Sequence, residues 1–177
     1  MIRRACEADI PSVAAIYDRI LSAQDRGILF TGWVRGVYPT KQTAQDALNA
    51  GELFVLEEEG SLLAAAKINQ QQVNEYVLAD WKYDVPEDQI MVLHTLVVDP
   101  EQSGRGYGTR FVRFYEHYAQ EHGCKYLRMD TNVINSAARK LYRGLGYQEV
   151  GIVPCRFNGI PNVRLVCLEK CLEENQC

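Results

Sequence analysis

Residues 90–123 read IMVLHTLVVDPEQSGRGYGTRFVRFYEHYAQEHG, in which an apolar run precedes a glycine-rich turn and a helical pattern. The apolar run predicts a buried strand, and the recurring aromatic and apolar residues after the turn predict a helix. The first backbone N–H groups of a helix have no partner within it, and glycines let a charged oxygen approach them closely. The positive end of the helix dipole, together with Arg105 and Arg110, favours an anion there. This stretch therefore predicts a phosphate-binding turn at residues 104–109.

Several ligands with phosphate groups bind to glycine-rich turns, and the spacing argues against two of them. A dinucleotide-binding turn needs a third glycine where Phe111 stands, although Asp130 could serve as its acidic residue. A nucleoside-triphosphate loop needs a Lys-Ser or Lys-Thr pair after the glycines, and this chain has none there. A turn that has only a structural role is the alternative interpretation when a glycine-rich stretch occurs without a second motif.

A second motif lies at residues 130–147, which read DTNVINSAARKLYRGLGY. The turn SGRGYG followed by N-x-x-A-x-x-L-Y-x-x-L-G-Y resembles the GNAT superfamily of acetyl-CoA-dependent N-acetyltransferases. The order of the expected elements fits that family from residue 2 to about residue 170. The resemblance implies an α/β (α+β) fold with a mixed, mostly antiparallel central sheet, a splayed parallel strand pair and helices on both faces.

We expect a single domain over residues 1–177, with a tail that is loose from about residue 171. Helical spacing of apolar residues predicts a first helix that Asp9 caps, and Thr40 or Thr43 can start a second one. A helix joins the strand at 90–98 to the next strand, so these two should be parallel. Asn135 is expected to cap a short helix that ends near residue 145. The other expected strands are 2–5, 53–58, 62–69, 126–129, 147–153 and 164–170.

The resemblance implies acetyl-CoA as co-substrate, with its pyrophosphate held by main-chain amides of the glycine turn. It also implies that Asn135 and Tyr142 face the pantetheine and the thioester. Ser103 stands where the family usually has Arg or Gln, so a side-chain contact to phosphate is either absent or supplied by Arg105. The main-chain site does not depend on that contact. The residues expected to bind the cofactor are Leu96, Val97, Val98, Ser103, Gly104, Arg105, Gly106, Tyr107, Gly108, Thr109, Asn135 and Tyr142.

Acyl transfer from a thioester to an amine requires a neutral amine, a stabilised oxyanion and a proton for the leaving thiolate. Tyr142 matches the tyrosine of the family and can donate that proton, although packing at the edge of the core would also explain it. His94 resembles the base of some family members, and a histidine of the core is the alternative. If His94 is not the base, Glu75, Asp80 or Asp84 acting through water come next.

Two stretches with aromatic residues are candidates for an acceptor pocket. Residues 27–40 mix Trp33 and Tyr38 with glycines, which fits either packing beneath an ordered loop or the wall of a pocket. Residues 70–89 combine Tyr83 with an excess of acidic residues, which fits either a solvated loop or a rim that attracts a cationic amine. Trp33, Tyr38 and Tyr83 are therefore the candidate substrate residues.

The resemblance favours an enzyme that transfers the acetyl group directly to a primary amine of a small molecule. A protein or peptide amine as acceptor is one alternative, and a non-catalytic regulator that binds acyl-CoA is another. A two-step transferase that uses Cys124 or Cys155 as nucleophile is disfavoured, because no His or Asp partner pattern surrounds either residue. The identity of the amine does not follow from these motifs.

The composition fits a soluble globular protein and argues against several other classes. Of the 177 residues, 47% are apolar and 24% are charged, and the net charge of −4 gives no basic surface for nucleic acid. No run approaches the roughly 20 apolar residues of a membrane span. The charged start MIRRACEADI is unlike a signal peptide, so we expect a cytoplasmic protein without a membrane partner. The six cysteines contain no C-x-x-C pair, which predicts free thiols and no metal; a homodimer is compatible with the sequence.

Overall fold

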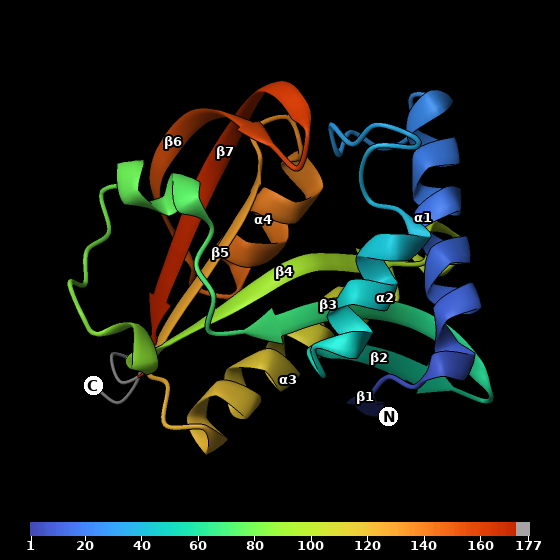
Figure 1. Ribbon diagram of the computed structural model, residues 1–177, viewed down its shortest axis with the longest axis horizontal. Coiled ribbons are helices and arrows are strands. Elements are labelled where there is room, and N and C mark those ends of the chain that lie inside the picture. Colours follow the sequence, from blue (N-terminus) through green and yellow to red (C-terminus); the bar gives the residue numbers. More distant parts are fainter. Residues whose placement is uncertain (173–177) are drawn as a thin grey trace.

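The computed structural model describes residues 1–172, which contain a seven-stranded sheet in the order β1-β2-β3-β4-β5-β7-β6 (Figure 1). Neighbouring strands are antiparallel except for β4 and β5, which are parallel. This is the mixed, mostly antiparallel sheet that the family resemblance of the sequence implies. The strands are β1 (Ile2–Arg4), β2 (Leu53–Glu58), β3 (Ser61–Asn69), β4 (Ile90–Val98), β5 (Tyr126–Asn132), β6 (Gln148–Phe157) and β7 (Ile160–Cys171).

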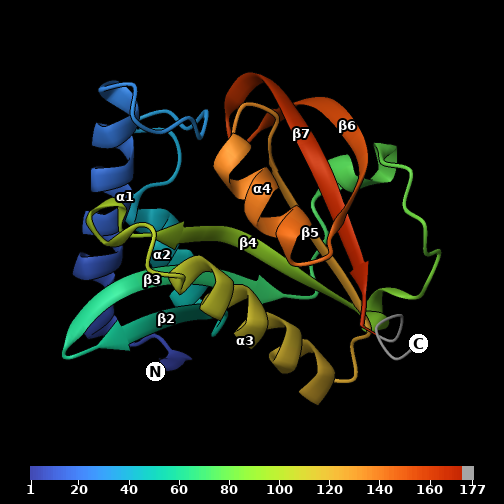
Figure 2. The same ribbon diagram turned by 180° about the vertical axis from the view of Figure 1, so that it is seen from behind.

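Helices cover both faces of the sheet, as expected (Figures 1 and 2). On one face, α1 and α2 bury their apolar sides against Val55 and Ala65. On the other face, α3 and α4 pack against Phe54 and Ala64. Adjacent residues of one strand thus serve opposite cores, because side chains alternate across a sheet. The helices are α1 (Ile10–Asp25), α2 (Lys41–Asn49), α3 (Tyr107–Glu121) and α4 (Ser136–Gly144).

The parallel pair splays apart part-way along its length. β4 and β5 are paired from Ile90 opposite Tyr126 to Leu93 opposite Met129, and no further. Beyond that point β4 runs under α1 and α2 while β5 turns towards α4, as Figure 1 shows. The splay leaves backbone N–H and C=O groups of both strands facing a gap, where a ligand can hydrogen-bond to them.

A bulge in β4 lies at the start of the splay. Ala65 of β3 is opposite Val97, whereas Lys67 is opposite His94, so β4 has one more residue than β3 over this interval. Thr95 takes up the extra length with a left-handed φ of 51°. Ala65 and Lys67 face the same side of the sheet, because they are two positions apart in β3. Their partners Val97 and His94 therefore also share that side, although they are three positions apart in β4.

Residues 70–89 pack against the sheet instead of forming a solvated acidic loop. The guanidinium carbon of Arg128 in β5 lies 4.1 Å from the centre of the Trp81 ring, and its Nη2 donates to the Tyr83 carbonyl at 2.7 Å. Glu169 of β7 pairs with Arg128 at 3.2 Å and accepts a main-chain hydrogen bond from the segment at 2.9 Å. Removing either buried charge would leave the other without compensation. The segment contains the short helices η2 (Asn74–Leu78) and η3 (Glu87–Gln89).

Three sequence-based expectations about element ends need correction. Asp9 precedes α1, but its carboxylate accepts hydrogen bonds from Arg3 at 2.7 Å and from the Cys6 amide at 2.8 Å, not from the helix. β6 and β7 extend past the expected ends, because their ladder continues to Phe157 opposite Ile160 beside a tight turn. The tail was expected to be loose from about residue 171, yet β7 includes Cys171; the rest of that prediction concerns residues 173–177, which lie outside the described part.

Within residues 1–172, none of the helices combines the length and the apolar character that crossing a membrane requires.

Candidate active site

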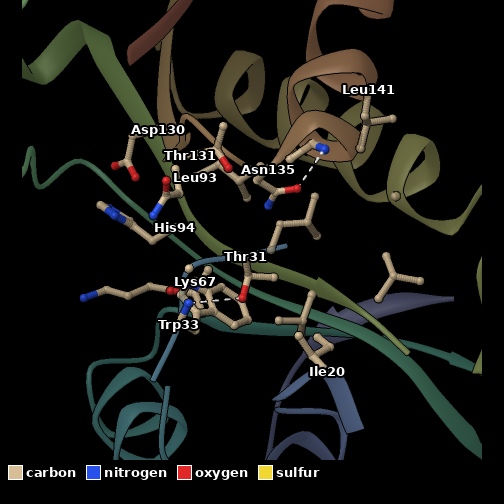
Figure 3. Close-up of a pocket in the computed structure, with 18 of the residues that line it drawn as sticks. Ile20, Thr31, Trp33, Lys67, Leu93, His94, Asp130, Thr131, Asn135 and Leu141 are labelled. Atoms are coloured by element: carbon tan, nitrogen blue, oxygen red, sulfur yellow. Dashed lines mark hydrogen bonds between the residues drawn. The ribbon is translucent and has the colours of Figure 1, made fainter. Parts of the chain in front are cut away.

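A cavity of about 820 Å³ opens where β4 and β5 separate. Asn135 and Leu141 line it from α4, and Ile20 lines it from α1 on the other side (Figure 3). Of the main candidates for catalysis and for binding of the cofactor and the acceptor, two do not line it. Arg105 is exposed on the turn before α3. Tyr83 packs against Tyr126, with the two ring centres 5.0 Å apart. The other candidate residues all line the cavity: Trp33, Tyr38, His94, Leu96, Val97, Val98, Ser103, Gly104, Gly106, Tyr107, Gly108, Thr109, Asn135 and Tyr142.

The glycine turn leads directly into α3, as the sequence predicts. Gly104 and Gly106 adopt left-handed φ angles of 78° and 79°, which other residues rarely adopt. No side chain caps the N-terminus of α3, so its first amide groups remain available beside the cavity. A side chain at Gly106 would meet nothing within 4 Å, which leaves open space in front of these amides. Arg110, expected to add positive charge here, is instead paired with Glu58 of β2.

Gly108 has a different role from its two neighbours. A Cβ atom at this position would lie 3.1 Å from Cδ2 of Leu141, so the glycine allows α3 and α4 to approach closely. Asn135 caps α4 as expected, since its Oδ1 accepts from the Ala138 amide at 3.2 Å. The turn and the second motif of the sequence therefore meet at one end of the cavity.

Tyr142 lines the cavity from α4 and is only 6% exposed. Its ring packs edge-on against Tyr147, with ring centres 6.1 Å apart. Burial raises the pKa of Tyr142 far above its usual value, and the charge of Asp130 adds to this effect. Its hydroxyl makes no hydrogen bond to any of residues 1–172. The phenol is therefore protonated and has a proton that it can donate into the cavity.

His94 is neutral in this environment. Its Nε2 lies 2.9 Å from Oδ1 of Asn69. The amide of Asn69 is oriented by two further hydrogen bonds, from its Nδ2 to Glu52 at 2.9 Å and from the Gln71 amide to its Oδ1 at 3.0 Å. His94 Nε2 must therefore donate, which leaves Nδ1 as the ring nitrogen that can accept a proton. Burial, and then the charge of Lys67, lower the pKa of His94 to about 4, well below the 6.5 of an unperturbed histidine.

Asp130 is a site residue that the sequence reasoning missed. It follows Met129, the last residue of β5 that pairs with β4, just as His94 follows Leu93 in β4. Its Oδ2 accepts a hydrogen bond from the Tyr76 hydroxyl at 2.8 Å, and it lines the cavity (Figure 3). Burial raises the pKa of Asp130 to about 6, although the bond from Tyr76 opposes this shift. The one sequence signal for it is a polar residue near the carboxyl end of a parallel strand, where ligands commonly bind.

Comparison with known proteins places the chain in a family. The sequence model described as the acetyltransferase (GNAT) family matches residues 21–147, well over half of the chain. The chain belongs to the GNAT family. Over 60 residues it is 43% identical to the N-alpha-acetyltransferase RimI of Mycobacterium tuberculosis, which covers 34% of this chain and 36% of that protein. The chain spans about a third of the length of the first curated relatives that it matches.

Solved structures share the GNAT fold with this chain. A GNAT family acetyltransferase from Streptococcus agalactiae has a TM-score of 0.80 and 22% identity, with 97% of this chain and 94% of that chain covered. YncA from Salmonella typhimurium, whose structure contains its cofactor acetyl-CoA, has a TM-score of 0.69 and 18% identity, with 100% and 96% covered. These likenesses confirm the fold class that the sequence predicts.

The α1–α2 segment of this GNAT chain, residues 26–40, is held in place by one side chain of α1. Nε2 of Gln24 donates to the Trp33 carbonyl at 2.7 Å. Its Oε1 accepts from the Thr31 amide at 3.1 Å, the Thr31 hydroxyl at 2.6 Å and the Gly32 amide at 2.9 Å. Each of these main-chain groups would lose a partner without Gln24, so this residue orders the part of the segment that reaches the cavity.

The α1–α2 segment covers one end of the cavity. A Cβ atom on Gly32 would lie 2.2 Å from Nδ2 of Asn132, so the segment crosses directly over the end of β5. Further along the segment, Val37 lies next to Gly159, which belongs to the turn between β6 and β7. A Cβ atom on Gly159 would be 3.3 Å from Cγ1 of Val37. Figure 1 shows this blue segment extending from α1 towards that turn. The cover restricts access to the end of the cavity that lies opposite the α3 N-terminus.

The alternative catalytic residues lie elsewhere in the described part of the chain. Glu75, Asp80 and Asp84 do not line the cavity, and neither do Cys124 and Cys155. Burial raises the pKa of Cys155 to about 11 and also raises that of Cys124, so both remain thiols rather than nucleophilic thiolates at neutral pH. Residues 1–172 contain no group of three or more His, Cys, Asp or Glu side chains that could hold a metal ion.

Proposed function

We propose that this GNAT protein transfers the acetyl group of acetyl-CoA directly to a primary amine of a small molecule. The observation that carries the proposal is one cavity that extends from the uncapped N-terminus of α3, through the splay of β4 and β5, to the aromatic residues beneath the α1–α2 segment. It offers an anion site at one end, open strand edges in the middle and a covered pocket at the other end.

We assign the pyrophosphate of acetyl-CoA to the main-chain amides of residues 104–109. The open space at Gly106 and the uncapped helix support this assignment, since both favour a close anion. The pantetheine amides would pair with the β4 backbone at residues 96–98, on the side that β5 leaves free. Asn135 and Tyr142 border this path. Acetyl-CoA bound to the Salmonella protein of the same fold supports the choice of ligand.

In the reaction, the amine nitrogen forms a C–N bond at the thioester carbon, and the C–S bond breaks with its electron pair on sulfur. Asp130 accepts the proton that the substrate ammonium must lose before attack. Tyr142 donates a proton to the departing thiolate and is reprotonated, through water, by the second proton of the attacking nitrogen. Asp130 suits the role of base better than His94, because a pKa of about 6 makes it about 100-fold more basic than a group at about 4. His94 then serves as a second acceptor, through Nδ1, that orients the amine.

A protein N-terminus is the alternative acceptor, and the similarity to RimI, named an N-alpha-acetyltransferase, favours it. The α1–α2 segment argues for the small molecule, because it covers the acceptor end and contacts both β5 and the β6–β7 turn. Thiol release from acetyl-CoA, measured with a panel of small amines and of peptides, tests the proposal. Release with small amines supports it; release with peptides alone would favour the protein acceptor. Acetyl-CoA binding without any release would indicate a regulator.

Replacing Gly106 with alanine is expected to weaken acetyl-CoA binding about tenfold or more, because the new methyl group enters the space assigned to the pyrophosphate. Gly60→Ala in the β2–β3 turn is the matched control, since Gly60 has a similar φ of 76°, open space around it and no place in the cavity. Both changes should cost about 1–2 kcal/mol of stability from backbone strain. Calorimetric titration of each folded variant measures the difference, and equal affinities would contradict the assignment.

Replacing Gln24 with leucine is expected to raise the KM for the amine about tenfold, while the KM for acetyl-CoA changes little. The change leaves the carbonyl of Trp33 and two amides of the segment without partners, at about 1–3 kcal/mol for each group that stays buried. Gln45→Leu on the exposed side of α2 is the control for the same substitution at the surface. Steady-state kinetics in both substrates checks this; a matching rise in the KM for acetyl-CoA would mean that the segment does not act on the acceptor alone.

A further inference from the structure

We infer that the acceptor is a monoamine whose cationic nitrogen is joined to an aromatic ring. This inference rests on the proposed function and adds the chemical class of the acceptor. Beneath the α1–α2 segment, the cavity combines a wall of aromatic rings with the carboxylate of Asp130, which forms no ion pair with residues 1–172.

The wall consists of three rings in edge-to-face contact. Trp33 and Tyr38 have ring centres 6.0 Å apart at 86°, and Tyr38 and Phe157 have centres 6.5 Å apart at 75°. The Tyr38 hydroxyl is hydrogen-bonded to Thr95 in the β4 bulge, so its ring is the part that remains for a ligand. Aromatic rings prefer the same edge-to-face or offset contacts with a further ring. Ile160, Val163 and Leu165 of β7 continue the apolar lining.

The carboxylate of Asp130 shares this space. Burial raises the pKa of Tyr38 to about 12, and the negative charge of Asp130 contributes to the shift. Cys155, which packs against the same wall, also has its pKa raised, first by burial and then by Glu75 and Asp130. Asp130 receives a hydrogen bond from Tyr76 but forms no ion pair with residues 1–172. A ligand ammonium would supply the missing positive charge, and its next atoms would then lie against the aromatic wall.

The charges of the cavity disfavour acceptors with several cationic groups. The charged side chains that line it are Asp46, Lys67 and Asp130, besides the neutral His94. Lys67 is itself cationic and pairs with Glu52 at 3.2 Å. Asp46 is exposed on α2 and accepts a hydrogen bond from Gln42, so it offers no buried partner for a second ammonium. Such an ammonium, a few bonds from the first, would lose its water against apolar side chains. The acidic residues of 70–89, which could have served a polyamine, lie outside the cavity.

The same lining disfavours a peptide. After its N-terminal nitrogen a peptide places an amide group at every residue, and each would need a partner along an apolar wall. The rim beside the covering segment is also apolar, because Val37 and Ile134, which lie next to Gly159 and Gly32, are 45% and 52% exposed. An aromatic amine needs only the charged contact at one end and apolar contact along the rest of its length.

Four primary amines distinguish the classes: 2-phenylethylamine, 2-cyclohexylethylamine, butane-1,4-diamine and a tetrapeptide with a free N-terminus. We expect kcat/KM for 2-phenylethylamine to exceed that for the diamine and the peptide at least about tenfold. It should also exceed kcat/KM for 2-cyclohexylethylamine, whose six-membered ring is of similar size but has no π system. A diamine, peptide or cyclohexyl compound that matches or exceeds the phenyl compound would overturn the inference.

Phe157→Leu provides a second test, since leucine keeps the apolar character and removes the ring. It should reduce the preference for phenyl over cyclohexyl, while Phe114→Leu, in the core on the α3 side, should leave the ratio unchanged. An unchanged ratio in Phe157→Leu would overturn the role assigned to this ring.

Ligand binding separates failure of this inference from failure of the proposed function. Trp33 is one of two tryptophans, and the other, Trp81, is packed against Arg128 outside the cavity. Titrating 2-phenylethylamine into the protein with CoA should change the tryptophan fluorescence, and Trp33→Phe should remove that change. Thiol release with any amine upholds the transferase; binding of the aromatic amine without thiol release from acetyl-CoA would overturn the transferase and leave the aromatic site standing. Absence of a Trp33-dependent change would overturn the aromatic site itself.

Discussion

Tyr142→Phe is expected to lower kcat about 10²–10⁴-fold while the dissociation constant of acetyl-CoA stays nearly the same. Phenylalanine keeps the ring that packs against Tyr147 and removes only the hydroxyl, which makes no hydrogen bond to residues 1–172. The variant should therefore fold normally and lose the proton donor for the thiolate. Steady-state kinetics and calorimetric titration with acetyl-CoA measure the two quantities separately.

Tyr147→Phe is the matched control for this experiment. Its ring belongs to the same aromatic pair, but it does not line the cavity, and its hydroxyl is buried without a hydrogen-bond partner within residues 1–172. Removing an unpaired buried hydroxyl should leave stability unchanged or raise it, and kcat should stay at the wild-type level. Full turnover in Tyr142→Phe would assign Tyr142 a packing role alone.

Asp130→Asn is expected to lower kcat/KM about 10²–10⁴-fold and to remove the pH dependence of the rate near pH 6. The carboxylate is the active form, so the wild-type rate should fall as pH falls through the pKa of about 6 and should level off above it. The raised pKa means that burial disfavours the charged form in the folded protein. Replacing it with a neutral amide should therefore not reduce the free energy of unfolding at neutral pH, and Asn can still accept the hydrogen bond from Tyr76.

His94→Gln tests which of the two groups is the base. The glutamine amide can still donate to Asn69, as the histidine does at 2.9 Å. We expect a smaller loss of kcat/KM and an unchanged inflection near pH 6, because a group with a pKa of about 4 does not titrate there. The profile, measured with one amine between pH 5 and 8, would contradict the assignment if the inflection vanished in His94→Gln and persisted in Asp130→Asn.

Local patterns were sufficient to predict most of the helices and strands, and the resemblance to the GNAT family supplied their arrangement in the sheet. The apolar run of β4, the glycine turn and the α3 pattern follow one another within 34 residues, and each depends on neighbours in the sequence. The parallel orientation of β4 and β5 followed from the helix between them. Errors arose where distant partners decide the outcome. Arg3 binds the carboxylate of Asp9, which was expected to cap α1, and the β6–β7 ladder extends both strands beyond their apolar cores.

The site was predictable where it consists of consecutive residues and not where it is assembled from distant ones. The turn at 103–109 was predicted from its glycines between a strand and a helix, and the Asn135–Tyr142 pair from the resemblance to the GNAT family. Asp130 was missed as a site residue, because its importance depends on where the strands separate and on the distant Tyr76. Gln24 was missed because nothing in its neighbourhood shows that it binds a segment of the chain further on. The low pKa of His94 likewise follows from burial and Lys67, which its own strand does not reveal.

The bulge at Thr95 makes the number of residues in β4 as important as their types. Strict alternation would place His94 and Val97 on opposite faces, and the extra residue brings them to the same one. Deleting Thr95 would remove the bulge and leave His94 two positions from Val97, so that regular alternation would keep both on the same face and Leu93 on the other. Glycine or asparagine, which tolerate a left-handed φ, should replace Thr95 without loss of the fold. Among homologous chains we therefore expect position 95 to vary in residue type, and insertions or deletions to be rare between Met91 and His94, where one residue more or fewer would exchange the faces of the side chains.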